Sequence, residues 1–500
     1  MARTFAELQQ RLGPALSANR LGSETDHVMI PLPSYSVSES LLSHYGDRIP
    51  SLEHRYLNAL LIAGRIPSTE LIYILSRAPD AAVIEYYLGL MPAAVRDRVR
   101  PRIHLLEIPL DGTPRSVATR LLDRPDRIAE VRRRIAGRPA FIEPWNVTEQ
   151  EVALALALDV PINGTDPSLR EAGFKSHGRR LIRDAGVPVP LGVEDVRTVD
   201  DVVAAIERIV AERPAAPGVV VKHDDSGAGD GNVVIDLGPL AGQSDRAAWL
   251  RAQVEALPAW YLADLERGGI VEERIAGTRF TSPSAQVDIR PDRSVLVLAT
   301  HEQVLGGEGG QVYLGCRFPA DPSYAPELAR HAAAIGEGLS RRGALGRFSV
   351  DFVAAADGDE PPRIFAIEIN LRKGGTTHPY AALRNAVPGH YDAAGGRWVT
   401  TADGSPRAYS ATDNLINPAW LGLAPAAVID AVAEAGLQFD PGSGLGVVLH
   451  MLSGLAIDGR FGLTAIGRTA DEARGLEDGV RDVVDRLCRT PRTAGRSGSS

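Results

Sequence analysis

Short apolar runs alternate with amphipathic segments along the first third of the chain. Residues 71–75 and 103–108 have the branched and aromatic side chains that are typical of buried strands, whereas residues 115–135 and 149–158 repeat their apolar positions with helical spacing. This alternation favours a parallel, doubly wound sheet over residues 1–165. No G-x-G-x-x-G motif opens a helix in that part of the sequence, so the sheet does not predict a standard dinucleotide site.

The pattern changes near residue 165, where Asp166 and Pro167 suit a helix N-cap and the first helical position. The helical pattern then runs to about Ala185 and closes at Gly186. A second α/β unit follows, which we assign to a small lid domain over residues 166–270. Its expected elements are helices at 199–212 and 245–266 and, between them, a strand that ends at Lys222.

From residue 271 onwards, strands with alternating polarity dominate and predict a central antiparallel domain over residues 271–420. The expected strands are 270–275, 284–289, 294–300 and 311–318, followed by a helix at 324–342 and a hairpin of residues 346–354 and 362–371. A small C-terminal α/β unit is expected over 421–488, with helices at 424–436 and 470–488 and strands at 445–452 and 461–466, before a disordered tail over 489–500. The fold class is therefore a mixture of α/β and α+β.

Composition narrows the function classes. The formal net charge of −9 and the sequence pI of about 5.7 argue against a nucleic-acid-binding protein. The two cysteines, Cys316 and Cys488, have no metal-ligand spacing, which fits a reducing compartment. No apolar stretch reaches 18 residues and the N-terminus lacks an apolar signal core. We therefore expect a cytoplasmic protein.

Lysine is almost absent from this chain. It occurs only at Lys175, Lys222 and Lys373, and the other 51 basic residues are arginine. All three lysines stand beside glycine-rich loops or carboxylates. A compact ammonium is not interchangeable with a planar guanidinium, so these positions suggest a need for a small cation at close range, as in a phosphate site.

A glycine-rich segment, residues 225–232, follows the strand that ends at Lys222. Its backbone N–H groups are suited to an anion, but the motif is not a P-loop because the lysine precedes the glycines. The alternative is a simple glycine turn between two strands.

The predicted hairpin carries the strongest candidate chemistry. Glu368 and Asn370 lie two residues apart and share one face of their strand, and the partner strand can place Asp351 beside them. Two carboxylates and an amide oxygen are hard ligands of the kind that Mg²⁺ takes while it holds phosphate oxygens. Arg372 adds a cation on the same face. The alternative is a solvated strand face whose apolar neighbours point to the core.

The order of these features resembles the ATP-grasp superfamily over residues 165–378. The resemblance implies an ATP-grasp fold with an N-terminal pre-ATP-grasp domain, a lid domain and a central domain that holds the metal. It implies that Lys175 and Lys222 bind the phosphates of ATP, that residues 226–232 close over the triphosphate and that Glu272 accepts from the adenine amino group. The implied nucleotide contacts are Lys175, Lys222, Ser226, Gly227, Gly229, Gly231, Asn232, Glu272, Glu273 and Ile275. Arg279 stands where many members have the ribose-binding glutamate, so the ribose contact departs from the family pattern.

A fuller set of motifs resembles the narrower group of ligases related to the peptide ligase of pheganomycin biosynthesis. These motifs are Asp166-Pro167-Ser168-Leu169, Lys222 to Gly227, Glu368 to Pro379 and Gly459 to Gly467. The resemblance implies an enzyme that couples an amino-acid-type carboxylate to a peptide or amino-acid amine, with ATP and Mg²⁺, and it suggests a homodimer. Mg²⁺ would be held by Asp351, Glu368 and Asn370.

The implied reaction forms an acylphosphate and ADP before the amine attacks. Arg372, Lys373 and the Gly374-Gly375 amides are the groups expected to stabilise the developing charge, with His378 as a further catalytic candidate. Candidates for the acceptor pocket are His378, Arg347, Arg317 and the loop Gly306 to Gly310. Two alternatives remain: a ligase of small amino acids or dipeptides, and a protein that senses ATP without turnover. Release of ADP with a mixture of acids and amines would discriminate them.

Overall fold

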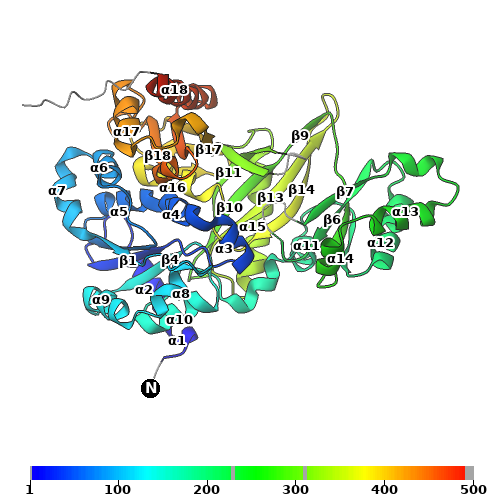
Figure 1. Cartoon of the computed structure of the whole chain (residues 1–500), viewed down its shortest axis with the longest axis horizontal. Helices are drawn as coiled ribbons and strands as arrows, with labels where there is room; N and C mark the ends of the chain where they lie inside the picture. Colours follow the sequence, from blue (N-terminus) through cyan, green and yellow to red (C-terminus); the bar gives the residue numbers. More distant parts are fainter. Residues whose placement is uncertain (1–2, 227–230, 308–311, 490–500) are drawn as a thin grey trace, which may run out of the picture.

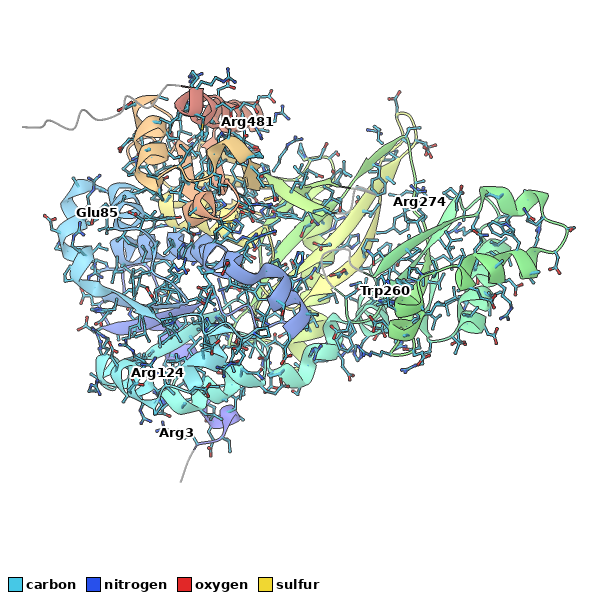
Figure 2. The ribbon with its side chains drawn as sticks, viewed as in Figure 1. Arg3, Glu85, Arg124, Trp260, Arg274 and Arg481 are labelled. Atoms are coloured by element: carbon cyan, nitrogen blue, oxygen red, sulfur yellow. The ribbon has the colours of Figure 1, made fainter. Side chains whose placement is uncertain are left out.

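The computed structural model describes residues 3–226, 231–307 and 312–489. Figure 1 shows an elongated molecule in which the N-terminal and C-terminal parts of the chain together form one end, a large sheet crosses the middle and a small lobe projects at the other end. Charged side chains such as Arg3, Glu85, Arg124 and Arg481 lie at the outer surface (Figure 2). Within the described ranges, no helix has the length and apolar character that a membrane crossing requires.

The N-terminal sheet consists of four parallel strands in the order β3-β2-β1-β4. Their bounds are His27–Leu32 for β1, Thr69–Leu75 for β2, Ile103–Glu107 for β3 and Ala140–Pro144 for β4. Val28 and Ile30 of β1 pack into one hydrophobic core, whereas Met29 between them packs into another. A strand with both faces buried is the mark of a doubly wound sheet. This confirms the fold class predicted for the first third of the chain.

Of the two helices predicted around this sheet, the one over 149–158 is confirmed and the other is divided. The single helix expected over 115–135 is two helices, because Pro125 cannot continue the first and occupies the first position of the second. The helices of this region are α1 (Phe5–Gln9), α2 (Leu12–Ala18), α3 (Glu39–Tyr45), α4 (Ile49–Glu53), α5 (Leu60–Arg65), α6 (Ala81–Gly89), α7 (Ala93–Val99), α8 (Val117–Leu122), α9 (Pro125–Ile135) and α10 (Glu149–Leu158), with 3-10 turns η1 (Gly46–Arg48), η2 (His54–Ala59) and η3 (Arg100–Arg102).

The small lobe is a four-stranded antiparallel sheet in the order β5-β8-β6-β7, covered by helices. Its strands are β5 (Gly192–Val196), β6 (Gly218–His223), β7 (Asn232–Asp236) and β8 (Gly269–Glu273), and its helices are α12 (Val199–Glu212), α13 (Arg246–Glu255) and α14 (Ala259–Leu265), with the 3-10 turn η5 (Gly238–Gly242). Pro258 divides the helix expected over 245–266 into α13 and α14. The entry helix is also divided, into the 3-10 turn η4 (Pro167–Gly173) and α11 (Lys175–Asp184).

The large sheet has eleven strands and contains the predicted hairpin. Its main path is β14-β13-β10-β11-β12-β17-β16-β15, with β9 beside β13, β19 beside β17 and β18 beside β19. The bounds are β9 (Arg279–Thr281), β10 (Pro283–Ile289), β11 (Val295–Gly306), β12 (Val312–Phe318), β13 (Gly346–Ala356), β14 (Arg363–Asn370), β15 (Gly389–Asp392), β16 (Arg397–Thr400), β17 (Pro406–Ile416), β18 (Gly446–His450) and β19 (Arg460–Gly467). Helix α15 (Ala325–Arg341) packs on β10 and β11.

The C-terminal segment continues this sheet and also packs on the N-terminal lobe. β19 pairs with β17 across the boundary that the sequence predicts at residue 420. Tyr86 of α6 donates from its hydroxyl to the carbonyl of Val447 and accepts from the amide of Leu449 in β18. The remaining helices are α16 (Thr377–Ala386), α17 (Pro425–Glu434) and α18 (Ala470–Arg489), with 3-10 turns η7 (Pro418–Trp420) and η8 (Leu452–Ala456). The sequence predicts residues 421–488 as a separate unit, whereas their strands share one sheet and one core with earlier residues.

Candidate active site

One face of β10, β13 and β14 carries polar side chains in three successive cross-strand rows. The rows are Ser284–Asp351–Glu368, Gln286–Ser349–Asn370 and Asp288–Arg347. Because members of one strand are two residues apart, all three rows face the same side of the sheet. The alternate residues Val287, Phe348 and Val350 enter the core under α15. The alternating sequence thus produces a polar strip that runs along the sheet.

The first two rows hold the three candidate metal ligands close together. Asn370 Nδ2 donates to Asp351 Oδ2 at 3.0 Å, and Asp351 also accepts from the Ser284 hydroxyl. Burial, and next the neighbouring Glu368 carboxylate, raise the pKa of Asp351 to about 6. Two carboxylates in one partly buried place therefore leave negative charge that a cation would relieve.

Lys175 reaches this carboxylate pair from the first turn of α11. Its Nζ lies 2.8 Å from Glu368 Oε2 and donates to the Ser226 carbonyl at 3.1 Å. Burial alone would raise the pKa of Glu368, but the ammonium of Lys175, followed by Arg372 and Lys222, lowers it. Lys175 is only 5% exposed, so the structure places the first rare lysine inside the site.

Lys222 lies in a second buried cluster of charges, in the small lobe. Its Nζ is paired with Glu272 Oε1 on the neighbouring strand, and the other carboxylate oxygen of Glu272 accepts from Arg179 Nη1 at 2.8 Å. Arg179 also donates from Nε to Glu194 at 2.9 Å and from Nη2 to the Pro190 carbonyl at 2.7 Å. Each buried charge thus has a partner of opposite sign, which such burial requires.

Some groups of the predicted adenine-binding hinge already form hydrogen bonds within the small-lobe sheet. Glu272 pairs through its backbone with β5 on one side and β6 on the other. Glu273 Oε1 accepts from the Leu191 amide at 2.8 Å, and Ile275 lies half-buried just beyond β8. Arg279 is exposed and donates to the Glu360 carbonyl at 2.6 Å, so its guanidinium lies at the β13–β14 turn.

The described ends of the glycine loop have restricted geometry. Gly231 has φ +87°, and a Cβ there would lie 2.8 Å from His223 Nδ1, so glycine is required on both counts. Ser226 Oγ donates to the His223 carbonyl at 3.1 Å, and Asn232 lies opposite Lys222 in the β6–β7 pair. Gly227 and Gly229, which the sequence assigns to phosphate binding, lie outside the described residues.

The segment after β14 brings two more cations to the strip. The Arg372 guanidinium stacks over the Trp145 ring at 5.2 Å. Lys373 Nζ lies 2.6 Å from Glu143 Oε1 and 5.7 Å from the centroid of the Tyr56 ring. These contacts join the large sheet to the C-terminal ends of the N-terminal strands.

The two glycines that follow Lys373 differ in their surroundings. The Gly374 amide donates to Thr377 Oγ1 at 3.0 Å, at the start of α16. This amide, which the sequence assigns to charge stabilisation, is therefore occupied. A Cβ on Gly375 would lie 2.5 Å from the Tyr313 ring, so close packing explains the glycine at that position without a catalytic role.

His378 belongs to a separate buried cluster. Its Nε2 lies 2.8 Å from Asp413 Oδ1, and His450 Nε2 lies 2.7 Å from the same oxygen, while Arg55 contacts Asp413 Oδ2 at 3.0 Å. The spacing of the two histidines and the aspartate resembles a metal site. However, Arg55 already neutralises the carboxylate, and both Nε2 atoms serve in hydrogen bonds to it, so we assign the cluster to structure. Burial is the main cause that lowers the pKa of His378 to about 4.

The other candidates for the acceptor pocket lie in different parts of the structure. Arg347 Nε donates to Asp288 Oδ1 at 3.0 Å in the third row of the strip. Arg317 is exposed on β12, opposite Glu302. Within the loop Gly306 to Gly310, residues 308–310 lie outside the described residues. Of the candidates that the structure describes, Arg347 alone therefore lies on the polar strip.

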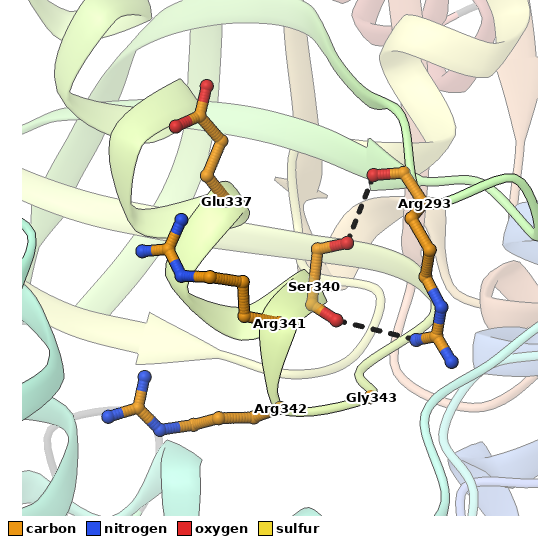
Figure 3. Close-up of a pocket in the computed structure, with 6 residues that line it drawn as sticks. All are labelled: Arg293, Glu337, Ser340, Arg341, Arg342 and Gly343. Carbon is orange, nitrogen blue, oxygen red and sulfur yellow. Dashed lines mark hydrogen bonds between the residues drawn. The ribbon is translucent and has the colours of Figure 1, made fainter.

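A cavity of about 630 Å³ lies between the N-terminal sheet and the polar strip. Glu143, Asp288, Arg347, Lys373 and Arg384 contribute its charged lining beside apolar residues of β1 and β4. Ligands of open α/β sheets bind at the carboxyl ends of the strands, and this cavity occupies that place. A second hollow, lined by Arg293, Glu337, Ser340, Arg341, Arg342 and Gly343, has its arginine side chains spread apart and includes no residue of the strip (Figure 3).

Several partners of the predicted residues escaped the sequence analysis. They are Arg179 and Glu194 around Glu272, Glu143 beside Lys373, and Asp288 beside Arg347. Glu143 ends a strand of the first sheet, and Asp288 lies two residues after Gln286 on β10. Glu143 is an acidic residue in an otherwise apolar strand, and Asp288 continues the alternation of polar residues on β10. Both are signals of function that the sequence did contain.

The residues in the first two rows of the strip fit the Mg²⁺ ion that the family resemblance implies. Two carboxylates and an amide supply hard oxygen ligands of the type that Mg²⁺ prefers. Burial, and next the Glu368 carboxylate, disfavour the charged form of Asp351, which a bound cation would favour. Two buried lysines within the same region can neutralise phosphate oxygens.

The chain is similar to known proteins. Residues 427–480 match the PGM1 C-terminal domain family. The L-propargylglycine–L-glutamate ligase of Streptantibioticus cattleyicolor is 35% identical over 459 residues, which cover 88% of this chain and 92% of that protein.

Two solved structures resemble most of the chain at low identity. The biotin carboxylase of Campylobacter jejuni, solved in a β-γ-ATP complex, covers 94% of this chain and 96% of its own, with 13% identity and a TM-score of 0.52. The biotin carboxylase domain of Hydrogenobacter thermophilus 2-oxoglutarate carboxylase, a dimer solved with MgADP, ADP and bicarbonate, covers 91% of this chain and 89% of its own, with 12% identity and a TM-score of 0.52. At such identities the likeness establishes the fold alone.

Proposed function

The chain belongs to the ATP-grasp carboxylate–amine ligases, in the group that includes the L-propargylglycine–L-glutamate ligase, and on that premise we propose that it joins the carboxylate of one amino-acid substrate to the amine of another amino acid or peptide. The carboxylate attacks the γ-phosphorus of ATP, an acylphosphate and ADP form, and the amine then displaces phosphate. One observation supports this assignment above the others: Lys175 meets Glu368 at 2.8 Å on the strand face that also holds Asp351 and Asn370.

Asp351, Glu368 and Asn370 are the residues that we propose to hold Mg²⁺. When bound, the metal supplies charge neutralisation for the β- and γ-phosphates. The protein's own contribution is to fix these oxygens on a rigid hairpin, because positioning and electrostatics account for most catalysis of phosphoryl transfer.

Lys175 and Lys222 are proposed to bind the phosphates by exchanging partners. Each lysine is now paired with a buried carboxylate, Glu368 or Glu272. An incoming polyphosphate offers more negative charge than one carboxylate, so both ammonium groups can turn to it without leaving a buried charge unpaired. Glu368 would then be free to serve as a metal ligand, while Arg179 keeps Glu272 neutralised.

Arg372 and Lys373 are proposed to stabilise the transferring phosphoryl group and the carboxylate that attacks it. Arg372 follows the end of β14 by two residues, and its electrostatic influence reaches both Asp351 and Glu368. Lys373 lies between the strip and the cavity, where a substrate carboxylate can approach it. Preorganised cations of this kind lower the barrier because they need no reorganisation during the reaction.

Nucleotide analysis tests this function directly. The purified protein is incubated with ATP, Mg²⁺ and a pool of amino acids and short peptides, and both nucleotides and products are identified by mass spectrometry. We expect ADP, phosphate and an amide in equal amounts, with Asp351→Asn as the inactive control. AMP and pyrophosphate would contradict the assignment, and ADP formation that ignores the acid would favour an ATP-sensing or bare ATPase protein. Dipeptides alone among the products would favour the ligase of small amino acids over a peptide acceptor.

The homodimer suggested by the resemblance stays a prediction, which light scattering would test.

A further inference from the structure

The cavity beside Lys373 is lined by the N-terminal sheet, the large sheet and helix α16. Its floor is the third row of the polar strip, Asp288 and Arg347, and one wall is the C-terminal part of β1 and β4. Helix α16 forms another wall through residues at helical spacing, which are Thr377, Tyr380, Ala381, Arg384 and Asn385. The cavity is therefore built from rigid elements, as a binding site requires.

Positive charge exceeds negative charge in the lining. The cations are Arg20, Arg290, Arg347, Lys373 and Arg384, and the anions are Glu143, Asp288 and Asp292. Lys373 is paired with Glu143 and Arg347 with Asp288. Arg384 is half-buried, and no residue in the described parts of the chain accepts a hydrogen bond from its guanidinium or forms an ion pair with it.

Arg384 acts on the same small group of side chains as Arg347. Burial tends to raise the pKa of Asp288, but Arg347, followed by Arg384 and Lys373, lowers it below its usual range. Burial raises the pKa of Tyr380, one turn before Arg384 on α16, and the guanidinium groups of Arg384 and Arg347 oppose that rise. The end of the cavity at the third row thus concentrates cationic charge beyond what Asp288 neutralises.

The rest of the lining is apolar. Met29, Leu32, Ile62 and Phe141 surround the cavity, with the rings of Tyr56 and Trp145 near Lys373. Such a surface suits the aliphatic part of an amino acid. The third row lies four residues along the strands from the Asp351–Glu368 row, which corresponds to about 14 Å at about 3.4 Å per residue. One amino acid and the reach of an arginine side chain can bridge that separation.

We propose that the cavity binds an amino-acid substrate through a carboxylate that does not react, with Arg384 and Arg347 as its partners. The guanidinium fork holds a carboxylate in two parallel hydrogen bonds, and the aliphatic part of the substrate packs on the apolar wall. Its reacting group then points past Lys373 towards the metal-binding row. This inference rests on the proposed ligase function and specifies the substrate class of that site.

Two substrates can present such a carboxylate. A donor must carry two carboxylates, one that is phosphorylated and one that Arg384 binds, so it would be a dicarboxylic amino acid. An acceptor needs only its free α-carboxylate, because its amine reacts. The shared chemistry is the spectator carboxylate, and the two cases differ in which substrate loses affinity when that group is removed.

Kinetics with matched substrates test the proposal in two arms. In the donor arm, hydroxamate formation with hydroxylamine and ATP compares L-glutamate with L-norvaline, which lacks the second carboxylate. In the acceptor arm, amide formation compares amino acids with their C-terminal amides. We expect one arm to show a KM at least about tenfold higher for the analogue without the carboxylate, as for the loss of a charged hydrogen bond. Arg384→Met should abolish that difference and leave the KM for ATP unchanged.

Two further variants separate a loss of carboxylate recognition from misfolding and from a general effect of removing an arginine. Arg384→Lys retains the charge and should restore part of the discrimination, which distinguishes lost recognition from a misfolded α16. Arg341→Met removes an arginine from the second hollow (Figure 3) and should change nothing. Equal KM values with and without the carboxylate in both arms would overturn the proposal, as would an Arg384→Met enzyme that still discriminates. If neither arm produces ADP with the wild-type protein, the ligase function itself fails instead.

Discussion

At the scale of single residues, the chain's lysines have surroundings that an arginine could not share. Lys175, Lys222 and Lys373 are between 5% and 7% exposed, and each is paired with one carboxylate. Such pockets fit an ammonium, which is smaller than a guanidinium and can rotate its three donors between partners. The sequence contains no other lysine, so these three positions stand out.

Lys222→Arg should therefore impair the enzyme although the charge is kept. The larger group must fit beside Glu272 and Arg179 in a buried space, and overpacking of this kind costs about 1–3 kcal/mol. We expect the KM for ATP to rise or kcat to fall by about tenfold or more. Arg133→Lys, on the exposed side of α9, is the matched control and should be silent. Wild-type kinetics for Lys222→Arg would remove the argument from rare lysines.

Asp351→Asn should lower turnover by about a hundredfold or more, because it removes a charged oxygen ligand worth several kcal/mol of charge stabilisation. The fold should survive, since the amide can still bond with Ser284 and Asn370. Circular dichroism and steady-state kinetics measured together check both statements. Asp97→Asn, at an exposed position on α7, provides the control. Activity within about twofold of the wild type would exclude the metal-ligand role that we propose for Asp351.

At the scale of elements, the alternation of polar and apolar residues along the strands predicted the site hairpin correctly. The helix predictions were less accurate, because they ran through prolines that end or divide helices. The hairpin of β13 and β14 confirms the prediction because its polar and apolar residues alternate. The breaks at Pro125 and Pro258 divide two predicted helices, although both prolines were visible in the sequence. Strand pairs that join distant segments, such as β17 with β19, leave no local signal. For the same reason the partners Glu143 and Asp288 could not be matched to Lys373 and Arg347 from sequence alone.

The end of the glycine loop gives a prediction about one element. Gly231→Ala forces an alanine to adopt φ +87° and also brings its Cβ against His223. Gly112→Ala has a similar φ of +79° but no neighbour within 4 Å. Positive φ alone should cost about 1 kcal/mol in both variants. We expect Gly231→Ala to lose clearly more unfolding free energy and to raise the KM for ATP; equal losses would contradict the close contact.

At the scale of the whole molecule, the two ends of the chain are held together by buried polar groups. His54 of η2 contacts Ser453 Oγ at 2.9 Å and the Arg77 carbonyl at 2.8 Å, so it joins the N-terminal lobe to η8. The Arg55–Asp413 pair connects η2 to β17, the strand with which β19 pairs. These contacts explain why residues 421–488 pack as part of the first lobe.

Burial of His54 predicts a pH dependence of stability. Burial lowers its pKa to about 4, against an ordinary value of 6.5. As pH falls from 6.5 to 4, His54 is protonated in the unfolded chain but stays neutral in the folded chain. The contribution of His54 to the free energy of unfolding is therefore fully present above pH 6.5 and is lost progressively below it. The loss should reach about 2 kcal/mol at about pH 5 for this histidine.

Urea unfolding at about pH 7.5 and about pH 5 measures this effect. His54→Gln should flatten the difference between the two pH values, whereas His44→Gln, at an exposed position on α3, should leave it unchanged. Glu53 works in the opposite direction, because burial raises its pKa to about 7 and its protonated form is favoured in the folded state as pH falls. An unchanged pH slope for His54→Gln would contradict the buried, neutral imidazole.

The central claim is that a substrate carboxylate attacks the γ-phosphorus of ATP at the Asp351–Glu368–Asn370 site. A donor acid labelled with ¹⁸O in its carboxyl group tests it most directly, because an acylphosphate passes one carboxyl oxygen to phosphate when the amine displaces it. The released phosphate is analysed by mass spectrometry after a complete reaction with ATP and the amine. We predict one ¹⁸O atom in each phosphate released and none in ADP. Unlabelled phosphate, or label in AMP, would contradict the account.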